Sequence, residues 1–179
     1  TILWGAGVMA NPLTKKLGVP LDRGGRIVVN PDLSVPGHPE VFAIGDIATV
    51  PHKDGKPVPW VSPAAMQMAR HVARIIEDEL EWVGRGVPGE PPPRPERPAF
   101  KYWDKGTMAT IGRSAAVALI GKVKLTGYIA WLAWLFIHLV FLVGLRSKFI
   151  VLFNWAYSYF TYKRGARIIT AADAYNKQA

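Results

Sequence analysis

The feature that most restricts the fold of this chain is a long uncharged run near its C-terminus. Residues 125–145 contain no Asp, Glu, Lys or Arg, and a helix of that length could cross a bilayer. Basic residues flank the run on both sides, so their charge predicts no orientation in a membrane. A second apolar and aromatic run covers residues 149–162. The two runs predict a pair of helices that must find an apolar environment.

Three arrangements of this helix pair remain open. Gly127, His138 and Gly144 interrupt the first run, and both runs are rich in Trp and Tyr, which prefer the lipid headgroup zone. This favours two amphipathic helices that lie in the membrane interface. A transmembrane hairpin and the buried helical core of a soluble domain are the alternatives. The candidate membrane residues are Trp131, Trp134, His138, Arg146 and Trp155.

The composition agrees with a membrane surface better than with nucleic acid. The chain combines a net charge of +9 with 50% hydrophobic residues. Its basic residues are spread between apolar runs, which is unlike the clustered basic face of a nucleic-acid-binding domain. It has no cysteine, so a disulfide, a Cys-ligated metal and a thiol redox pair are excluded within these residues, and we expect no metal site.

A strand, a turn and a helix in the first half predict a ligand site. The apolar run 41–44 predicts a short buried strand, which ends in Gly45-Asp46, and Ser62 and Pro63 mark a helix start as N-cap and first helical residue. A glycine allows close approach to the backbone, a carboxylate at a strand end can bind a sugar hydroxyl, and a helix N-terminus offers free N–H groups. The alternative is an ordinary turn after a strand.

Periodicity and turn residues organise the rest of the chain. Apolar residues recur at helical spacing from Pro63 to Val83, which predicts an amphipathic helix, and residues 26–29 predict a strand. Two glycine patterns with dinucleotide-binding spacing, at 5–10 and 84–89, are interpreted as a turn and a linker, because neither lies between a strand and a helix.

The expected segments follow from these signals. Residues 100–103, 107–111 and 115–120 are predicted to be short strands separated by glycine-containing turns. We therefore expect a first domain at 1–85, a Pro- and Gly-rich linker at 86–99, a small antiparallel sheet at 100–122, membrane-associating helices at 123–170 and a tail at 171–179.

Taken in order, these motifs resemble the C-terminal half of a type II NADH dehydrogenase, the single-subunit NADH:quinone oxidoreductase. The resemblance is carried by Ala43-Ile44-Gly45-Asp46, by the helix start 62–67, by the segment 100–113, and by the aromatic and basic tail residues. It implies an α/β fold: the C-terminal part of a two-Rossmann-domain flavoprotein, with FAD-domain strands and a helix, then a small antiparallel sheet and two amphipathic membrane-anchoring helices.

The resemblance also implies roles for individual residues. Gly45 and Asp46 would bind FAD, and the backbone of Ala64 and Ala65 would lie against the flavin ring. At the helix start, Ser62 and Pro63 replace the family's Ala and Gln, so only one of its two glutamines is present. The expected catalytic residues are Gln67 and Lys105, and Lys105 would also contact the flavin cofactor. The expected quinone-side residues are Gln67, Met66 and Met108, the last near the quinone tunnel.

The implied activity is electron transfer from NADH through FAD to ubiquinone or menaquinone, without proton pumping and by a ping-pong mechanism. The family suggests a homodimer, formed through the C-terminal helices, on the cytoplasmic face of the inner membrane, and the excess of Lys and Arg favours an anionic leaflet. Because the chain opens at Thr1 within a strand-like run, we expect a fragment without the N-terminal glycine fingerprints, inactive alone.

Two rival functions have distinct sequence requirements. A sulfide:quinone oxidoreductase of the same superfamily needs redox cysteines, and this chain has none. A non-catalytic membrane-surface module would use Gly45-Asp46 only as a turn, and it would bind no flavin.

Overall fold

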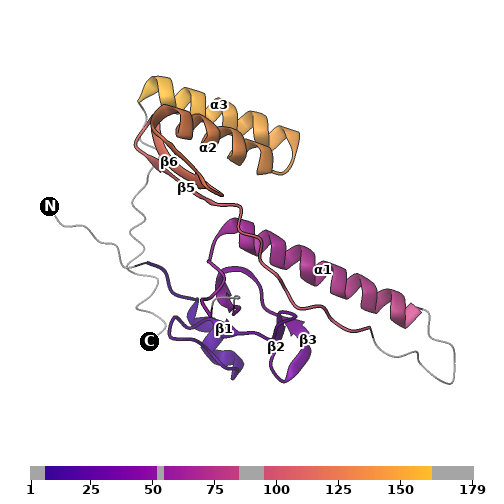
Figure 1. Ribbon diagram of the computed structural model, residues 1–179. Coiled ribbons are helices and arrows are strands. Elements are labelled where there is room, and N and C mark those ends of the chain that lie inside the picture. The colour runs from indigo at the N-terminus through magenta and orange to yellow at the C-terminus, as the bar shows by residue number, and fades with distance from the viewer. Residues whose placement is uncertain (1–6, 52–54, 85–94, 163–179) are drawn as a thin grey trace, which may run out of the picture. The chain divides into compact units, whose positions relative to one another are not determined.

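The computed structural model describes residues 7–51, 55–84 and 95–162 (Figure 1). The chain forms two compact units, Thr1–Asp104 and Lys105–Ala179, which are treated separately below. The predicted strand-like run at the N-terminus and the predicted tail at 171–179 lie outside the described residues.

The first unit contains short strands and one long helix. In order, it has the 3-10 helix η1 (Pro12–Leu17), the strands β1 (Ile27–Val28), β2 (Ser34–Val35) and β3 (His38–Phe42), the 3-10 turn η2 (Gly45–Ile47), the strand β4 (Ala48–Thr49) and the helix α1 (Ser62–Gly84). β1 pairs in parallel with β4, and β2 pairs antiparallel with β3.

The predicted strands exist but are shorter or shifted. Residues 26–29 supply only β1, and the run 41–44 was expected as a buried strand, whereas β3 ends at Phe42. Val41 is 47% exposed, and the buried residue is Ala43, whose N–H donates to the carbonyl of Leu33. The reason is that β3 belongs to a two-stranded hairpin, in which most residues face solvent.

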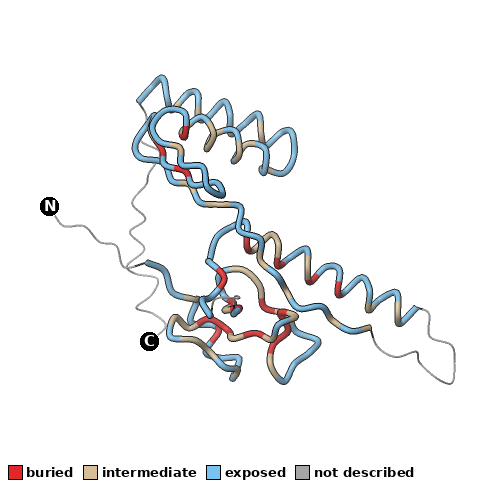
Figure 2. Tube along the Cα trace, viewed as in Figure 1, coloured by how far each residue is buried: buried red, intermediate tan, exposed pale blue. Residues whose placement is uncertain are grey.

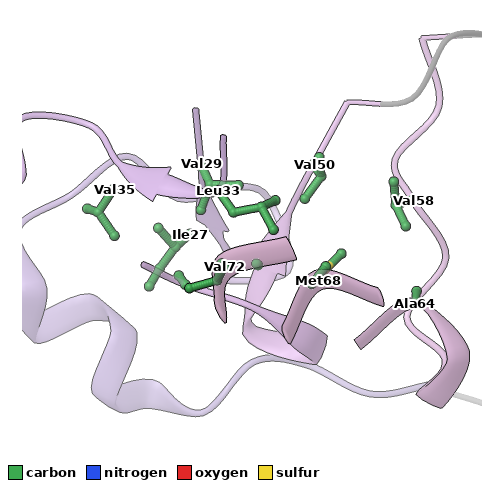
Figure 3. Close-up of a cluster of buried hydrophobic side chains, with 11 residues drawn as sticks. Ile27, Val29, Leu33, Val35, Val50, Val58, Ala64, Met68 and Val72 are labelled. Carbon is green, nitrogen blue, oxygen red and sulfur yellow. The ribbon is translucent and has the colours of Figure 1, made fainter. Parts of the chain in front are cut away.

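Helix α1 supplies one side of the core. Ala64, Met68, Val72 and Ile75 are buried at three- and four-residue steps, so the helix is amphipathic, as predicted. The buried face differs from the predicted one: of the apolar positions that predicted the helix only Val72 is buried, and Ile76, Leu80 and Val83 are exposed. Figure 2 shows the four buried positions along one side of α1. Three of them meet the valines and leucine of the strand region, as Figure 3 shows for Val29, Leu33 and Val50. The helix begins one residue earlier than expected, because the carbonyl of Val61 accepts from the N–H of Ala65.

Residues 100–103 form no strand, contrary to the prediction. Their backbone groups bond to side chains and loops instead: the N–H of Phe100 donates to the carbonyl of Pro31 at 2.7 Å, and Trp103 pairs with Gln67 of α1. Phe100 and Tyr102 pack against the core of the first unit. Of the predicted linker at 86–99, residues 95–99 are described, and Arg97 anchors them.

The second unit is a three-stranded antiparallel sheet followed by two helices. β5 (Thr107–Ile111), β6 (Ala115–Ile120) and β7 (Val123–Thr126) lie in that order, and α2 (Gly127–Phe141) and α3 (Leu145–Thr161) follow. The predicted strands 107–111 and 115–120 are confirmed, while β7 was not predicted. Ala116 and Ala118 of β6 are buried against Ala130 of α2, whose small side chains allow close contact.

The uncharged run is divided between a strand and a helix. Its first two residues, Leu125 and Thr126, belong to β7, and α2 begins at Gly127, which has a φ of 68°. Among the described residues, no helix is both long and apolar enough to span a bilayer. Figure 2 shows α2 and α3 almost wholly as exposed or partly exposed.

Candidate functional site

The Gly45-Asp46 turn is packed directly against the first turns of α1. Gly45 has a φ of 73°, and a side chain at that position would be strained. Its N–H donates to the sulfur of Met68 at 3.2 Å, and a Cβ placed on it would lie 3.6 Å from that of Ala65. The turn and the helix start, predicted separately from the sequence, are therefore neighbours.

Asp46 is the exposed acidic residue of this turn. Within the described residues its carboxylate has no hydrogen-bond or ion-pair partner, so both oxygens can accept hydrogen bonds from a ligand hydroxyl. Gly45 fixes the turn that presents it. This is the chemistry expected for binding the sugar-like part of a nucleotide cofactor.

The start of α1 offers fewer free donors than the sequence suggested. Pro63 has no N–H, and the N–H groups of Ala64 and Ala65 both donate to the carbonyl of Val61, at 2.9 and 3.2 Å. Ala64 is buried and Ala65 is partly buried beside Gly45. Ala65 is thus an apolar neighbour of the turn, whereas Ala64 belongs to the core, and the amides of both are occupied within the chain.

Gln67 is held at both ends of its side-chain amide. Its Nε2 donates to the carbonyl of Trp103 at 3.0 Å, and its Oε1 accepts from the N–H of Trp103 at 3.0 Å. Met66, its neighbour, is partly buried. Because both ends of this amide bond to Trp103, Gln67 fixes residues 100–104 on α1. A ligand could bond to the Gln67 amide only by displacing Trp103.

Arg97 anchors the same segment further along α1. Its guanidinium donates to both carboxylate oxygens of Glu79, at 2.7 and 3.0 Å, and to Asp32 at 3.1 Å. A further bond reaches the carbonyl of Pro39 at 2.6 Å. Burial alone would raise the pKa of Asp32, but hydrogen bonds from Ser34 and Arg97 and the charge of Arg97 together hold that pKa below its usual value.

In the second unit, Lys105 and Met108 lie at the start of the sheet. The ammonium of Lys105 lies 5.3 Å from the ring centroid of Phe141, and Met108 is partly buried beside the small core of Ala116, Ala118 and Ala130. Gly106 between them is required, because a Cβ there would lie 2.1 Å from the carbonyl oxygen of Leu119.

The candidate membrane residues lie on α2 and α3. The rings of Trp134 and Trp155 are 5.4 Å apart, and His138 stacks on Trp134 at 4.1 Å while its Nδ1 lies 2.8 Å from the carbonyl of that tryptophan. Arg146 is exposed at the start of α3. Trp131 lies 5.5 Å from Tyr159, so aromatic side chains connect the two helices along their length.

Sequence reasoning missed three residues of this site. Met68 was not among the apolar positions from which the helix was predicted, although its place one turn after Ala64 and Ala65 is the available signal that it faces the turn. Trp103 and Arg97 lie in a segment without periodicity, so no local pattern predicts that they bond to α1.

Comparison with known proteins identifies the family. A model of the pyridine nucleotide-disulphide oxidoreductases matches residues 1–73, and a model of the NDH2 C-terminal domain matches residues 104–163. The type II NADH:quinone oxidoreductase NdhA of Mycobacterium tuberculosis is 43% identical over 178 residues, which are 97% of this chain and 35% of that protein. The chain belongs to the type II NADH:quinone oxidoreductases.

Other type II oxidoreductases agree with this assignment. Ndh of the same bacterium is 43% identical over 177 residues, with the same coverage of both chains, and the mitochondrial internal alternative NAD(P)H-ubiquinone oxidoreductase A1 of Arabidopsis thaliana is 30% identical over 163 residues, or 86% of this chain and 31% of that protein. This chain spans about a third of the length of these relatives.

A solved structure shares the fold. NDH2 from Plasmodium falciparum, determined in complex with NADH, superposes with a TM-score of 0.68 at 14% sequence identity and covers 92% of this chain and 46% of that one. The α/β fold that the sequence predicted, with a small antiparallel sheet and C-terminal helices, is thus the fold of a type II NADH:quinone oxidoreductase.

Proposed function

We propose that this chain forms part of a flavoprotein that passes electrons from NADH through FAD to a membrane quinone, without pumping protons. The observation that carries the proposal is the packed pair of the Gly45-Asp46 turn and the start of α1, in a chain of this family. When bound, a flavin supplies the redox chemistry, because it accepts a hydride and can then be reoxidised. The protein supplies binding, orientation and exclusion of water.

The residues of the turn fit one part of FAD. Asp46 would accept hydrogen bonds from the ribityl hydroxyls of FAD, and Gly45 would allow the backbone to approach the ribityl or pyrophosphate region. Ala65 would form an apolar wall for the ring, supported from the core by Ala64, and neither would donate to the ring because their N–H groups bond to Val61.

The quinone side would be formed by residues next to this wall. We propose Gln67 as the residue that bonds to the quinone carbonyl after exchanging its contact with Trp103, with Met66 as an apolar neighbour. Lys105 and Met108 are proposed to lie near the flavin and the quinone in the assembled enzyme. Either ubiquinone or menaquinone would serve as the acceptor.

The second unit would attach the enzyme to the membrane. Residues 105–162 carry six Lys and Arg and no Asp or Glu, and the outward side chains of α2 and α3 include exposed apolar residues such as Phe136, Phe149 and Phe153. Basic charge beside exposed apolar and aromatic residues suits an anionic lipid surface. We propose peripheral, monotopic association with the cytoplasmic face of the inner membrane, as a homodimer.

The decisive experiment compares two electron acceptors. In the full-length protein, Gln67→Ala should slow the reduction of a short-chain quinone by NADH and leave the reduction of ferricyanide, which needs no quinone site, unchanged. Arg70→Ala, on the exposed side of α1, is the matched control and should change neither rate.

Two outcomes would reject parts of the proposal. If Gln67→Ala slows both acceptors equally, Gln67 only holds residues 100–104 in place. If the purified protein contains no flavin, the chain belongs to a membrane-surface module without redox activity.

A further inference from the structure

The groove between α2 and α3 is lined by apolar and aromatic side chains. Its volume is about 350 Å³, and its walls include Leu135, Leu139, Trp155, Ala156 and Tyr159. The rings of Trp131 and Tyr159 lie 5.5 Å apart across the two helices. An apolar channel with a polar-tipped aromatic pair suits a molecule that has one hydrocarbon chain and one polar end.

Arg113 lies beside the Tyr159 end of this groove. It projects from the turn between β5 and β6, and its guanidinium carbon lies 3.6 Å from the ring centroid of Tyr162 and 5.2 Å from that of Tyr159. One of its N–H groups donates to the carbonyl of Tyr159. A guanidinium has five N–H donors, so others remain for an anion, and the side chain is exposed.

Among the described residues of its unit, Arg113 has no acidic counterpart. Residues 105–162 contain Lys105, Arg113, Lys122, Lys124, Arg146 and Lys148 but no Asp or Glu. An anion from outside is therefore favoured over a second copy of residues 105–162, which would bring six more positive charges to the same place.

We propose that the groove holds one acyl chain of an anionic phospholipid whose phosphate bonds to Arg113. The arginine fork matches phosphate geometry, and the rings of Tyr159 and Tyr162 hold the guanidinium next to Tyr159, which lines the groove. The site rests on the proposed membrane association of the whole enzyme and names the lipid that the second unit binds.

Native mass spectrometry of the full-length protein, offered phosphatidylglycerol and phosphatidylcholine in equal amounts, tests the site. The unsubstituted protein should retain one phosphatidylglycerol per subunit. Arg113→Gln should lower that retention roughly tenfold, the value of one charge-assisted hydrogen bond. Ala156→Leu, which fills the groove and leaves the arginine intact, should lower it as well. Glycerol phosphate, which has no acyl chain, should fail to displace the lipid.

Lys122→Gln is the charge-matched control, because it removes one exposed cation of the same unit away from the groove lining. Equal loss in Arg113→Gln and Lys122→Gln would overturn the site, since charge alone would explain retention. If the protein is dimeric and retains no lipid, the lipid site is rejected, and a second copy of the chain becomes the occupant of the groove. Sedimentation with anionic vesicles separates the two proposals: a protein that sediments but retains no lipid refutes the groove site alone, whereas one that does not sediment refutes membrane association. Circular dichroism must show unchanged helix content in each variant.

Discussion

Asp46 illustrates what one residue contributes to the candidate site. Its carboxylate is exposed at the turn that Gly45 forms against Ala65, and no described side chain competes for it. Asp46→Asn in the full-length protein should therefore lower the flavin content of the purified enzyme without affecting its folding, because an amide is a weaker acceptor than a carboxylate. Flavin extraction against protein concentration measures the change. Asp78→Asn, on the exposed side of α1, should retain its flavin, and equal flavin in both variants would remove Asp46 from the site.

Arg97 makes a contribution of another kind, to stability. It joins Asp32, Glu79 and the carbonyl of Pro39, and its side chain is only 12% exposed. Arg97→Ala should destabilise the contact between residues 95–104 and α1 by about 2 kcal/mol. This is less than the cost of removing one partner from a fully buried ion pair, because Arg97 is partly exposed. Hydrogen exchange of the α1 amides should then accelerate about 30-fold. Exchange unchanged from that of Arg70→Ala would show that the ion pairs add nothing.

Two carboxylates of the first unit, Asp22 and Asp32, predict how its stability depends on pH. Asp22 resembles Asp32: burial would raise its pKa, but hydrogen bonds from Thr49, Arg26 and Gly24 hold the pKa below the usual value. Since the folded pKa is depressed, the stabilisation is complete above the unfolded value of about 4 and is lost as pH falls through the folded pKa. The thermal midpoint should therefore hold above about pH 5 and fall below about pH 4. A midpoint that rises on acidification would contradict this assignment.

At the scale of elements, Gly106 tests the register of the sheet. Its φ is 100°, and a Cβ would lie 2.1 Å from the carbonyl oxygen of Leu119, the partner of Thr107. Gly106→Ala should cost about 3 kcal/mol and expose the β6 amides to exchange. Gly121 has a φ of 59° with open space around its Cα, so Gly121→Ala should lower the stability by only about 1 kcal/mol. Equal hydrogen exchange of the β6 amides in the two variants would mean that the backbone shifts to relieve the clash at residue 106.

The elements also show what the sequence could predict. Periodic or alternating segments such as α1, β5 and β6 were predicted with correct or nearly correct bounds, because burial on one side leaves a pattern. The segment 100–103 was predicted as a strand from its aromatic residues, yet its partners are the side chain of Gln67 and the carbonyl of Pro31. Such bonds depend on tertiary contacts and leave no local signal. The resemblance to the family predicted Gln67 as a quinone-side residue, but its hydrogen bonds to Trp103 could be seen only in the structure.

At the scale of the whole molecule, charge should govern attachment to lipid. With six cations and no carboxylate at 105–162, binding of the full-length protein to anionic vesicles should weaken as salt increases. Arg146→Gln should lower the vesicle partition coefficient about fivefold, the effect of one cation near an anionic surface. Co-sedimentation with vesicles at several salt concentrations measures both effects. Binding that is indifferent to salt and headgroup charge would leave only the apolar side chains of α2 and α3 as its cause.

The central claim is that electrons pass from NADH through bound flavin to quinone, and anaerobic stopped-flow of the full-length protein in detergent tests it most directly. NADH should bleach the absorbance of oxidised flavin, and a short-chain quinone added afterwards should restore it rapidly, with parallel initial-rate plots in steady state. Restoration by oxygen but by no quinone would contradict the account.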